Sequence, residues 1–397
     1  MAKKRILMVL GSLQAGGAEK ALVSLLNTLP EDRYDIDLLL SSPKGLFVSQ
    51  VPTYVRFIEP PKGFVMINHR LSDWKFFIQQ NPIQIFKKAF RTFKAKRKKN
   101  LFFEQAIWSQ WKDSIPTLNG SYDIAYGGLE GICNYFVLDK VNARRKIVWV
   151  HNDYEKLGYN DEFDRPYFSR ASFVATMSET ARDILQRHFP ESADHIVHWE
   201  NIINGAMIRK MAQEPVSDDC YKHIDGINII SVGRLAPQKN YRRAIQTAAV
   251  LKRHGIPFRW TVIGDGPDRK MLEELCIELD VTDEMAFIGI RANPYKYITR
   301  SDILVVSSDY EGKSIAIDEA QVLGIPTITT DYPTAGDSIV NGQTGIICDM
   351  TAEAIAQSLI ELYNDRTLYD TIRRNLQSKK DGNISEVAKY INAFESE

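Results

Sequence analysis

Two glutamates, Glu311 and Glu319, stand eight positions apart in residues 307–320, a stretch rich in side chains that could do chemistry. An apolar run ends near Val306 and a helical pattern begins near Ser314, so Glu311 is predicted to lie in a loop and Glu319 in a helix. Carboxylates placed in this way do not form the close acid–base pair of a glycosidase. We expect them to hold different hydroxyl-bearing parts of one ligand, while the N-terminus of the helix offers backbone N–H groups to a phosphate.

Two cations, Arg234 and Lys239, follow the apolar run of residues 229–232 and stand five positions apart. If the run is a strand, both cations lie at its carboxyl end, where open α/β sheets bind ligands. Arginine supplies a bidentate fork and lysine a mobile point charge, and this combination suits a diphosphate. Without further support, the same pair could be ordinary surface charge.

A glycine-rich turn, Gly16-Gly17-Ala18-Glu19, lies between the apolar run of residues 5–10 and a helical pattern. Gly11 and Gly16 have the spacing of a P-loop, but the Lys and Ser or Thr that must follow are absent. Glycines before a helix let a ligand approach the backbone closely, and the free N–H groups favour an anion. The alternative is a tight turn that binds nothing.

The elements that must position these residues alternate regularly along the chain. Short apolar runs typical of buried parallel strands occur at residues 5–10, 36–40, 124–126, 146–150 and 173–177, and again at 227–232, 260–263, 286–288, 303–306, 327–329 and 345–348. Helical patterns separate them, for example over residues 244–254 and 269–279. The sequence therefore predicts an α/β fold of two Rossmann-like domains, each a doubly wound parallel sheet, with a cleft between them.

The predicted domain boundary lies in residues 198–226, where Asn204-Gly205, Pro215 and Ser217-Asp218-Asp219 indicate a hinge and linker. We expect an N-terminal domain of residues 1–204 and a C-terminal domain of residues 205–375. A helix in residues 376–397 is expected to pack back on the N-terminal domain.

The composition is typical of a globular chain, since 44% of its 397 residues are hydrophobic and 25% are charged. Lys plus Arg and Asp plus Glu each number 50, and this zero net charge argues against nucleic acid as a partner. The balance hides an asymmetry, because residues 1–200 carry a net charge of +6 and residues 201–397 a net charge of −6. Opposite signs indicate two domains with different partners.

Cysteine and histidine spacing indicates no metal site. The cysteines Cys133, Cys220, Cys276 and Cys348 are spaced singly, so neither a disulfide framework nor structural zinc is predicted. His188, His195 and His198 lack a third ligand at a suitable spacing, and we expect surface histidines. The first apolar run stops at Leu10, too short for a signal peptide or a membrane span, so a cytoplasmic protein is expected.

Residues 83–100 interrupt the alternation with eight basic residues and no acidic one. Phe86, Phe90 and Phe93 recur there with helical spacing. A basic helix with an aromatic face is the composition that lies in an anionic membrane surface. The alternative is a solvated helix whose phenylalanines pack on the domain.

Motifs along nearly the whole chain resemble the retaining glycosyltransferases of family 4, which have the GT-B fold. The motifs are, in order, Gly16-Gly17-Ala18-Glu19, Val148-Trp149-Val150-His151, Val232-Gly233-Arg234 with Lys239, Val262-Ile263-Gly264-Asp265-Gly266-Pro267, Glu311 with Glu319, and Leu323-Gly324-Ile325-Pro326-Thr327-Ile328. The sequence departs from the family where Ser314 replaces a glycine and where Asn240, rather than glycine, follows Lys239. The resemblance implies a nucleotide-sugar donor on the C-terminal domain, an acceptor on the N-terminal domain, and catalysis without a metal or other cofactor.

The resemblance also implies a role for each matching residue. Arg234 and Lys239 would neutralise the donor diphosphate. Glu319 would hold the ribose, Glu311 the transferred sugar, and His151 would lie near that sugar from the other domain. The implied catalytic residues are Glu311, His151, Arg234 and Lys239, and the implied donor-binding residues are Gly16, Gly17, Gly233, Arg234, Lys239, Gly264, Arg291, Gly312, Ser314, Ile315 and Glu319. Arg291 is a candidate contact to the base, for which uracil is favoured by its frequency in such enzymes.

On this basis we expect a retaining, metal-independent hexosyl- or N-acetylhexosaminyltransferase that uses a UDP-sugar. The expected acceptor is a glycan on a lipid diphosphate, an intermediate of a bacterial surface polysaccharide such as a capsule or exopolysaccharide, at the inner face of the cell membrane. Two alternatives remain open. The acceptor could be a soluble sugar or a protein, or the chain could be a non-catalytic GT-B subunit that supports a partner transferase.

Overall fold

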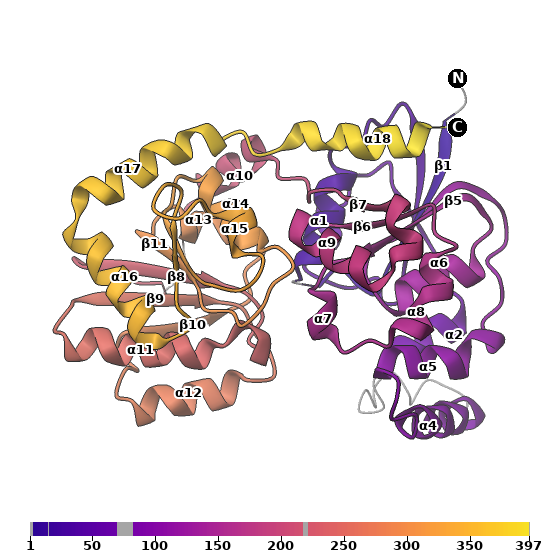
Figure 1. Cartoon of the computed structure of the whole chain (residues 1–397), viewed down its shortest axis with the longest axis horizontal. Coiled ribbons are helices and arrows are strands. Elements are labelled where there is room, and N and C mark those ends of the chain that lie inside the picture. Colours follow the sequence, from indigo (N-terminus) through magenta and orange to yellow (C-terminus); the bar gives the residue numbers. More distant parts are fainter. Residues whose placement is uncertain (1–2, 15, 70–81, 217–220, 397) are drawn as a thin grey trace. The chain divides into compact units, whose positions relative to one another are not determined.

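The computed structural model describes residues 3–14, 16–69, 82–216 and 221–396. The chain forms two compact units. The first unit consists of Met1–Gln14, Ala18–Glu200 and Val387–Glu397, and the second of Ala15–Gly17 and Asn201–Glu386 (Figure 1). Ser217-Asp218-Asp219 of the predicted linker and Cys220 lie outside the described residues.

The first unit is built on a seven-stranded parallel sheet with the order β3-β2-β1-β4-β5-β6-β7. Its strands are β1 (Lys4–Leu10), β2 (Tyr34–Leu40), β3 (Arg56–Ile58), β4 (Tyr122–Gly127), β5 (Ala143–Val150), β6 (Phe173–Thr176) and β7 (Ile196–His198). All five strands predicted for this half are confirmed. The edge strands β3 and β7 were not predicted, because three residues are too few for a periodic signal.

Helices cover both faces of the first sheet. They are α1 (Gly17–Leu26), α2 (Lys62–Asn68), α4 (Pro82–Lys96), α5 (Phe103–Trp111), α6 (Ile132–Lys140), α7 (Tyr154–Leu157), α8 (Asp161–Phe168), α9 (Glu179–His188) and α18 (Val387–Glu395). Val148 and Val150 of β5 join a buried cluster with Trp108 of α5 and Phe136 of α6. Because side chains alternate along a strand, Trp149 faces the other way, where it meets α18.

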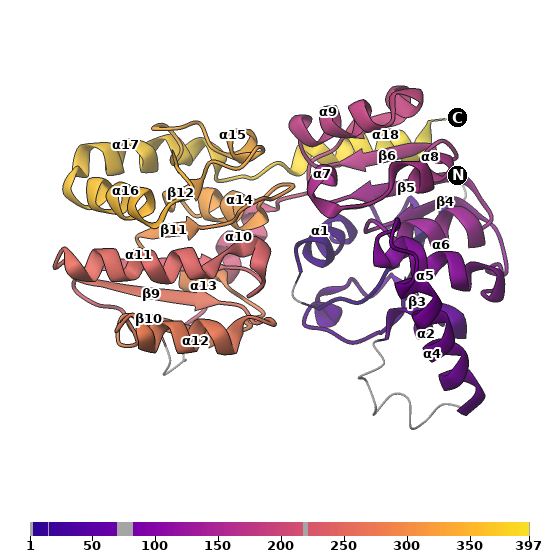
Figure 2. The same ribbon diagram turned by 60° about the horizontal axis from the view of Figure 1, so that its bottom comes forward.

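The second unit is built on a six-stranded parallel sheet with the order β10-β9-β8-β11-β12-β13. In Figure 2 its labelled strands β10, β9, β11 and β12 follow one another from bottom to top. The strands are β8 (Ile227–Val232), β9 (Phe258–Ile263), β10 (Met285–Gly289), β11 (Ile303–Val306), β12 (Thr327–Thr330) and β13 (Ile346–Cys348). Every strand predicted in this half is present within two residues of its expected bounds. The predicted fold class of two α/β, Rossmann-like parallel-sheet units is confirmed.

The helices of the second unit also divide between two faces. They are α10 (Gly205–Ala212), α11 (Tyr241–Arg253), α12 (Arg269–Glu278), α13 (Tyr295–Ile298), α14 (Ile315–Val322), α15 (Ala335–Ser338), α16 (Ala352–Asn364) and α17 (Arg366–Leu376). One buried cluster joins Ile229 to α11, α12, α16 and α17. The next residue, Ile230, belongs to a second cluster with α10, α13 and α14. Strands with two buried faces explain the continuous apolar runs of the sequence.

Each sheet has a point where the strand order reverses. In the first unit it lies between β1 and β4, and in the second between β8 and β11. In open α/β sheets, ligands bind outside the carboxyl ends of the strands at such a point. The loops that follow β1, β4, β8 and β11 are therefore where the fold offers binding sites.

The last helix, α18, belongs to the first unit, whereas α16 and α17 belong to the second (Figure 1). Long-range hydrogen bonds anchor α18, among them two from strands of the first sheet. Lys4 Nζ donates to the carbonyl oxygen of Phe394 at 2.9 Å, and Arg145 Nη1 donates to that of Ala393 at 2.7 Å. The chain re-enters the first unit at Val387, so the strand-rich part of that unit and its last helix come from opposite ends of the sequence.

Candidate active site

Arg234 and Lys239 lie in the loop that follows β8, at the point where the strand order reverses. Arg234 is exposed, and within the described part of the chain no carboxylate forms an ion pair with it. Lys239 ends a short 3-10 helix, η4 (Pro237–Lys239), and its side chain is 22% exposed. The two cations thus differ: one is open to a ligand and the other is held by the protein.

The partner of Lys239 is Glu311, which lies in the loop after β11, as predicted. Lys239 Nζ lies 2.5 Å from Glu311 Oε1, and Ser308 Oγ donates a hydrogen bond to the same oxygen at 2.5 Å. Glu311 is only 5% exposed. Both bonds go to Oε1, so in the part of the chain described here Oε2 can accept a hydroxyl of a ligand. A cationic and a neutral donor thus hold this buried carboxylate in place.

A second ion pair holds the two loops in place. Arg243 of α11 donates to the carbonyl oxygen of Ser307 at 2.7 Å and to Asp309 Oδ1 at 2.7 Å. Asn240, in the left-handed conformation with φ 43°, donates to the same Asp309 oxygen at 2.9 Å. These residues were not predicted from the sequence, because the contacts join loops that are separated by more than sixty residues.

Gly264 allows the loop after β9 to approach the loop after β8. Its φ of 150° lies in the region that favours glycine, and a Cβ atom built on it would lie 1.9 Å from the carbonyl oxygen of Gly233. The Gly233 N–H in turn donates to the carbonyl oxygen of Ile263 at 3.0 Å. The backbone next to Arg234 is therefore fixed by a contact that only glycine can make.

Helix α14 begins just after Glu311, and Ser314 is its N-cap residue. The Ser314 side chain makes no capping hydrogen bond, and Gly312 and Ser314 are both buried while Ile315 is partly buried. The N-terminus of α14 therefore keeps backbone N–H groups that a phosphate oxygen can accept from. Lys313, between these residues, places Nζ 3.9 Å from Asp318 Oδ2.

Glu319 lies inside α14 and is held by a tyrosine that was not predicted. Tyr295 Oη donates to Glu319 Oε1 at 2.9 Å, and both side chains are buried. Burial, with Glu319 as a further cause, raises the pKa of Tyr295 well above its usual value, so its hydroxyl keeps its proton. The signal that could have found Tyr295 is its place in the loop of residues 289–295, which contains Arg291, the candidate contact to the base. Arg291 in that loop donates to the carbonyl oxygen of Ile290 at 3.1 Å.

In the first unit, His151 follows β5 and its ring lies against Trp149. The ring centroids are 4.8 Å apart and the planes 18° from parallel. Burial lowers the pKa of His151 to about 4, so the ring is neutral at pH 7. Gly16 and Gly17 lie in the loop after β1, where Gly17 begins α1.

Glu130, in the loop after β4, is a second unpredicted residue of the first unit. Its carboxylate accepts the backbone N–H of His151 at 2.8 Å and a hydrogen bond from the Asn152 side chain. Burial raises the pKa of Glu130. Its position at the carboxyl end of the predicted strand 124–126 was the sequence signal for it.

The three histidines considered as metal ligands have separate partners. His188 Nδ1 lies 2.6 Å from Asp161 Oδ2, His195 Nε2 lies 3.0 Å from the carbonyl oxygen of Phe168, and His198 Nδ1 lies 3.7 Å from Glu179 Oε1. Within the described ranges, no group of three or more His, Cys, Asp or Glu side chains is placed to hold a metal ion. Metal independence remains a prediction.

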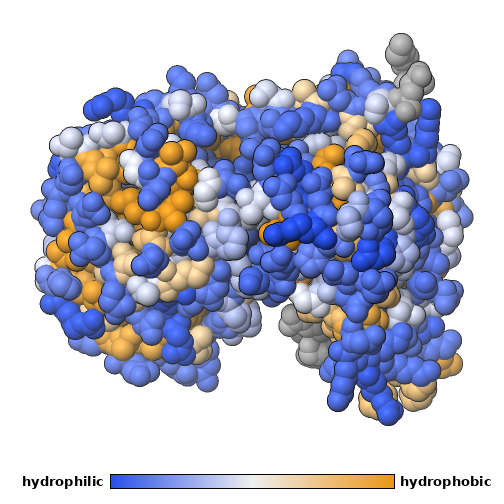
Figure 3. Space-filling model, in the orientation of Figure 1, coloured by the Kyte–Doolittle hydropathy of each residue, from blue (hydrophilic) through white to orange (hydrophobic). Residues whose placement is uncertain are grey.

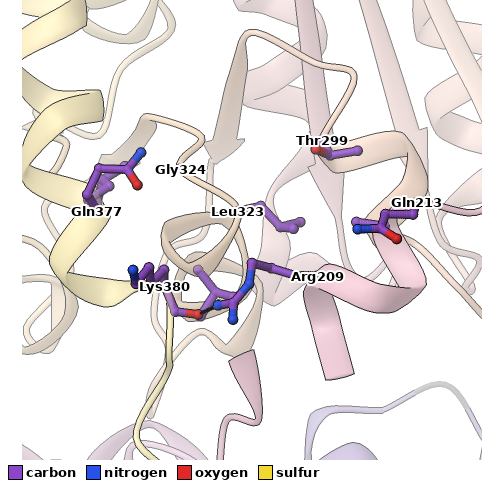
Figure 4. A pocket seen from close by; sticks show the side chains of 10 residues that line it. Arg209, Gln213, Thr299, Leu323, Gly324, Gln377 and Lys380 are labelled. Carbon is purple, nitrogen blue, oxygen red and sulfur yellow. Dashed lines mark hydrogen bonds between the residues drawn. The ribbon is translucent and has the colours of Figure 1, made fainter. Parts of the chain in front are cut away.

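A cavity of about 320 Å³ lies elsewhere in the second unit (Figure 4). Its lining includes Arg209, Gln213, Thr299, Gln377 and Lys380, and none of the predicted site residues. The Arg209 guanidinium is already bonded to the carbonyl oxygen of Lys380. The cavity is therefore distinct from the cluster around Lys239 and Glu311.

Comparison with known proteins agrees with this geometry. Residues 223–379 match the family described as glycosyl transferases group 1, and this range contains every candidate from Gly233 to Glu319. The capsular polysaccharide biosynthesis glycosyltransferase CapM of Staphylococcus aureus is 28% identical over 41% of this chain and 43% of its own length. A putative colanic acid biosynthesis glycosyltransferase, WcaL of Salmonella typhimurium, is 27% identical over 37% of this chain and 38% of its own length. The chain thus spans less than two thirds of these curated relatives.

Solved structures resemble almost the whole chain. HepE of Anabaena in complex with UDP-glucose covers 98% of both chains with a TM-score of 0.69 at 16% identity. TarM of S. aureus in complex with UDP covers 99% of this chain and all of its own, with a TM-score of 0.66 at 14% identity. At these identities the likeness shows the fold. The fold is GT-B, and the family match of residues 223–379 together with the polysaccharide-biosynthesis relatives supports a glycosyltransferase.

Proposed function

We propose that the protein is a retaining glycosyltransferase that moves a hexosyl or N-acetylhexosaminyl group from a UDP-sugar to a glycan hydroxyl. The observation that carries the proposal is the contact of Lys239 with Glu311 beside the exposed Arg234, at the point where the second sheet reverses its strand order. A bound diphosphate requires cations, and a bound sugar requires a group that accepts hydrogen bonds from its hydroxyls. The cations and the carboxylate lie together here.

The donor is proposed to lie along the carboxyl edge of the second sheet. Arg234, Lys239 and the N-terminus of α14 would face the diphosphate, because each offers positive charge or N–H groups. Glu319, fixed by Tyr295, would accept the two ribose hydroxyls, and Oε2 of Glu311 would accept a sugar hydroxyl. UDP is favoured because solved structures with this fold, among them HepE and TarM, contain UDP.

The proposed reaction breaks the bond between the anomeric carbon and the diphosphate oxygen, and the electron pair leaves with the UDP. Arg234, Lys239 and the α14 N-terminus would stabilise the growing negative charge, each by about 3 kcal/mol if water is excluded. The acceptor oxygen bonds to the anomeric carbon on the face that the diphosphate leaves, and its proton passes to the departing phosphate oxygen. This route retains the anomeric configuration and uses no metal.

His151 is proposed to contact the transferred sugar from the first unit. Because burial lowers its pKa to about 4, the ring is neutral at pH 7 and offers one hydrogen-bond donor and one acceptor. A neutral ring suits sugar hydroxyls and adds no second cation near the oxocarbenium-like carbon. Gly16 and Gly17 would let the backbone of the loop after β1 approach the donor.

The acceptor is proposed to be a lipid-linked glycan at the inner face of the cell membrane, on the basis of helix α4. Its aromatic residues are turned to solvent: Phe86 is 72% exposed, Phe90 48% and Phe93 58%. The buried face consists of Lys88, Thr92 and Ala95 instead. Lys88 Nζ donates to the carbonyl oxygen of Ile67 at 3.1 Å. Phe86 and Phe93 are mostly exposed and Phe90 about half exposed, which supports a membrane contact over a helix whose phenylalanines pack on the domain.

Cations surround the exposed rings of α4. Lys94 Nζ lies 4.6 Å from the centre of the Phe90 ring, and Arg97 lies 5.4 Å from that of Phe93. In Figure 3 the region of α4, at the lower right, mixes hydrophobic and hydrophilic side chains. Rings at the acyl boundary with cations at lipid phosphates match this pattern. Over the ranges that the structure describes, no helix is both long and apolar enough to cross a bilayer.

A screen of nucleotide sugars tests the proposed activity. Purified protein is incubated with UDP- and GDP-sugars, and release of the nucleoside diphosphate is measured with and without extracted lipid-linked glycans. Turnover of a UDP-sugar that is lost in Glu311→Ala and reduced in Arg234→Ala is the expected result. If no donor is turned over, and neither variant changes nucleotide affinity, the chain is a non-catalytic subunit. Turnover that needs only soluble sugars or protein would overturn the lipid-linked acceptor.

A further inference from the structure

Tyr390, in the last helix, lies deep in the first unit. The residue is 2% exposed, and its hydroxyl donates to the carbonyl oxygen of Glu200 at 2.8 Å. Its ring centroid lies 6.0 Å from that of Trp149, and the two planes are 14° from parallel. A residue close to the C-terminus is thus packed on strand β5, which leads to the candidate active site.

Trp149 links this contact to His151. The indole is fully buried, and the His151 ring lies 4.8 Å from it at 18°. The backbone of Trp149 is fixed by Asn134, whose side chain donates to its carbonyl oxygen at 2.8 Å and accepts from its N–H at 3.3 Å. The indole ring itself is held by packing against neighbouring aromatic side chains. Tyr390, Trp149 and His151 therefore form one set of nearly parallel rings.

We infer that Tyr390 is a positioning residue for His151. Helix α18 then contributes to the geometry of the acceptor-side site and not only to the stability of the first unit. The backbone N–H of His151 is fixed by Glu130, its side chain hydrogen-bonds the Gly128 backbone, and the face of its ring packs on the Trp149 indole. Removing the Tyr390 ring leaves space beside Trp149, so the indole can reorient and the imidazole loses its packing surface. The inference rests on the role proposed above for His151.

Two substitutions of Tyr390 test this inference in the full-length protein. Tyr390→Leu removes the ring and Tyr390→Phe keeps it, while both lose the hydroxyl bond to Glu200. Phe394→Leu is the matched control, because Phe394 is equally buried on α18 but meets Tyr34 edge-on at 5.8 Å and 89°. Thermal unfolding, kcat, donor KM and the NMR titration of His151 are measured for each variant.

The expected result is that Tyr390→Leu lowers kcat by about three- to tenfold, with little change in donor KM. The pKa of His151 should rise from about 4 towards its usual value as water reaches the ring. Tyr390→Phe and Phe394→Leu should keep both the wild-type kcat and the His151 titration, even where they lower the unfolding temperature.

The inference is overturned if the His151 titration is unchanged in Tyr390→Leu, or if Phe394→Leu lowers kcat and shifts the titration equally. His151→Ala separates the two proposals. If that variant transfers sugar at the wild-type rate, the proposed role of His151 fails, and the titration still decides whether Tyr390 orients the ring.

Discussion

Lys239 Nζ and Glu311 Oε1 lie 2.5 Å apart although 72 residues separate them in the sequence. The contact joins the loops that follow two neighbouring strands, β8 and β11, of one sheet. Burial of Glu311 costs its carboxylate the contact with water, and the cation of Lys239 offsets this desolvation. Lys239 is itself a candidate for binding the donor. The side chains of Lys239 and Glu311 thus hold each other in place before any ligand binds.

Replacing either Lys239 or Glu311 should lower activity by more than the loss of their mutual contact would explain. In Glu311→Ala the charge of Lys239 loses its partner, and in Lys239→Met the carboxylate of Glu311 is left buried with only a hydroxyl donor. We expect kcat to fall by about a hundredfold or more in each variant. Steady-state kinetics with the donor found in the screen measure this. Glu353→Ala, an exposed carboxylate of α16 in the same unit, is the control and should leave kcat unchanged.

Gly264→Ala should destabilise the second unit, since the new Cβ would lie 1.9 Å from the carbonyl oxygen of Gly233 in a backbone conformation that favours glycine. We expect a loss of about 2–4 kcal/mol in the free energy of unfolding and weaker UDP binding. Gly336→Ala in α15 is the control, because its Cβ would meet nothing within 4 Å. Denaturant unfolding measures the free energy of unfolding of both variants. Equal values for Gly264→Ala and Gly336→Ala would contradict the expected strain.

Replacing Phe86, Phe90 and Phe93 together with Ser should abolish flotation with anionic vesicles while leaving the unfolding temperature unchanged, because these side chains are exposed. Neutralising the four basic residues 96–99 with Gln should weaken binding at low salt most strongly, since salt screens that contribution. Ile277→Ser, an equally exposed apolar residue of α12, is the control. Wild-type protein that ignores anionic vesicles at low salt would contradict the membrane contact.

Glu104 should make stability depend on pH. Burial raises its pKa to about 7, although the Tyr159 hydroxyl bonded to it at 2.9 Å acts in the other direction. Between pH 4.5 and 7 the folded protein holds a proton that the unfolded chain has released, so the free energy of unfolding falls as pH rises through this window. Glu104→Gln should remove this slope and be more stable than wild type by about 1–3 kcal/mol at pH 8, but not at pH 4.5.

His151 contributes the opposite slope and must be separated from Glu104. Its pKa is lowered to about 4 in the folded protein. As the pH falls below 6.5, the unfolded chain therefore binds a proton that the folded protein does not bind, and the free energy of unfolding falls. Comparing wild type with Glu104→Gln leaves the His151 contribution in both proteins. Chemical unfolding from pH 4.5 to 8 provides the measurement, and parallel curves would show that Glu104 titrates normally.

Much of this site could be predicted from local patterns. Continuous apolar runs mark strands buried on both faces, and in a parallel sheet such runs end at one edge. Arg234, Lys239 and Glu311 each follow a run, so their common location was a consequence of strand ends alone. Tyr295 and Glu130 were missed because their role depends on partners, Glu319 and His151, that no spacing reveals.

The sequence by itself determined most of the strands, several helices and the edge of each sheet at which the charged residues gather, because these follow from the periodicity of neighbouring side chains. Only the tertiary structure decided which side chains meet. It paired Lys239 with Glu311, turned Phe86 outward and Lys88 inward on the same helix, and brought Tyr390 to Trp149. Such contacts join residues far apart in the chain, and their free energy comes from packing and charge pairing that exist only after folding.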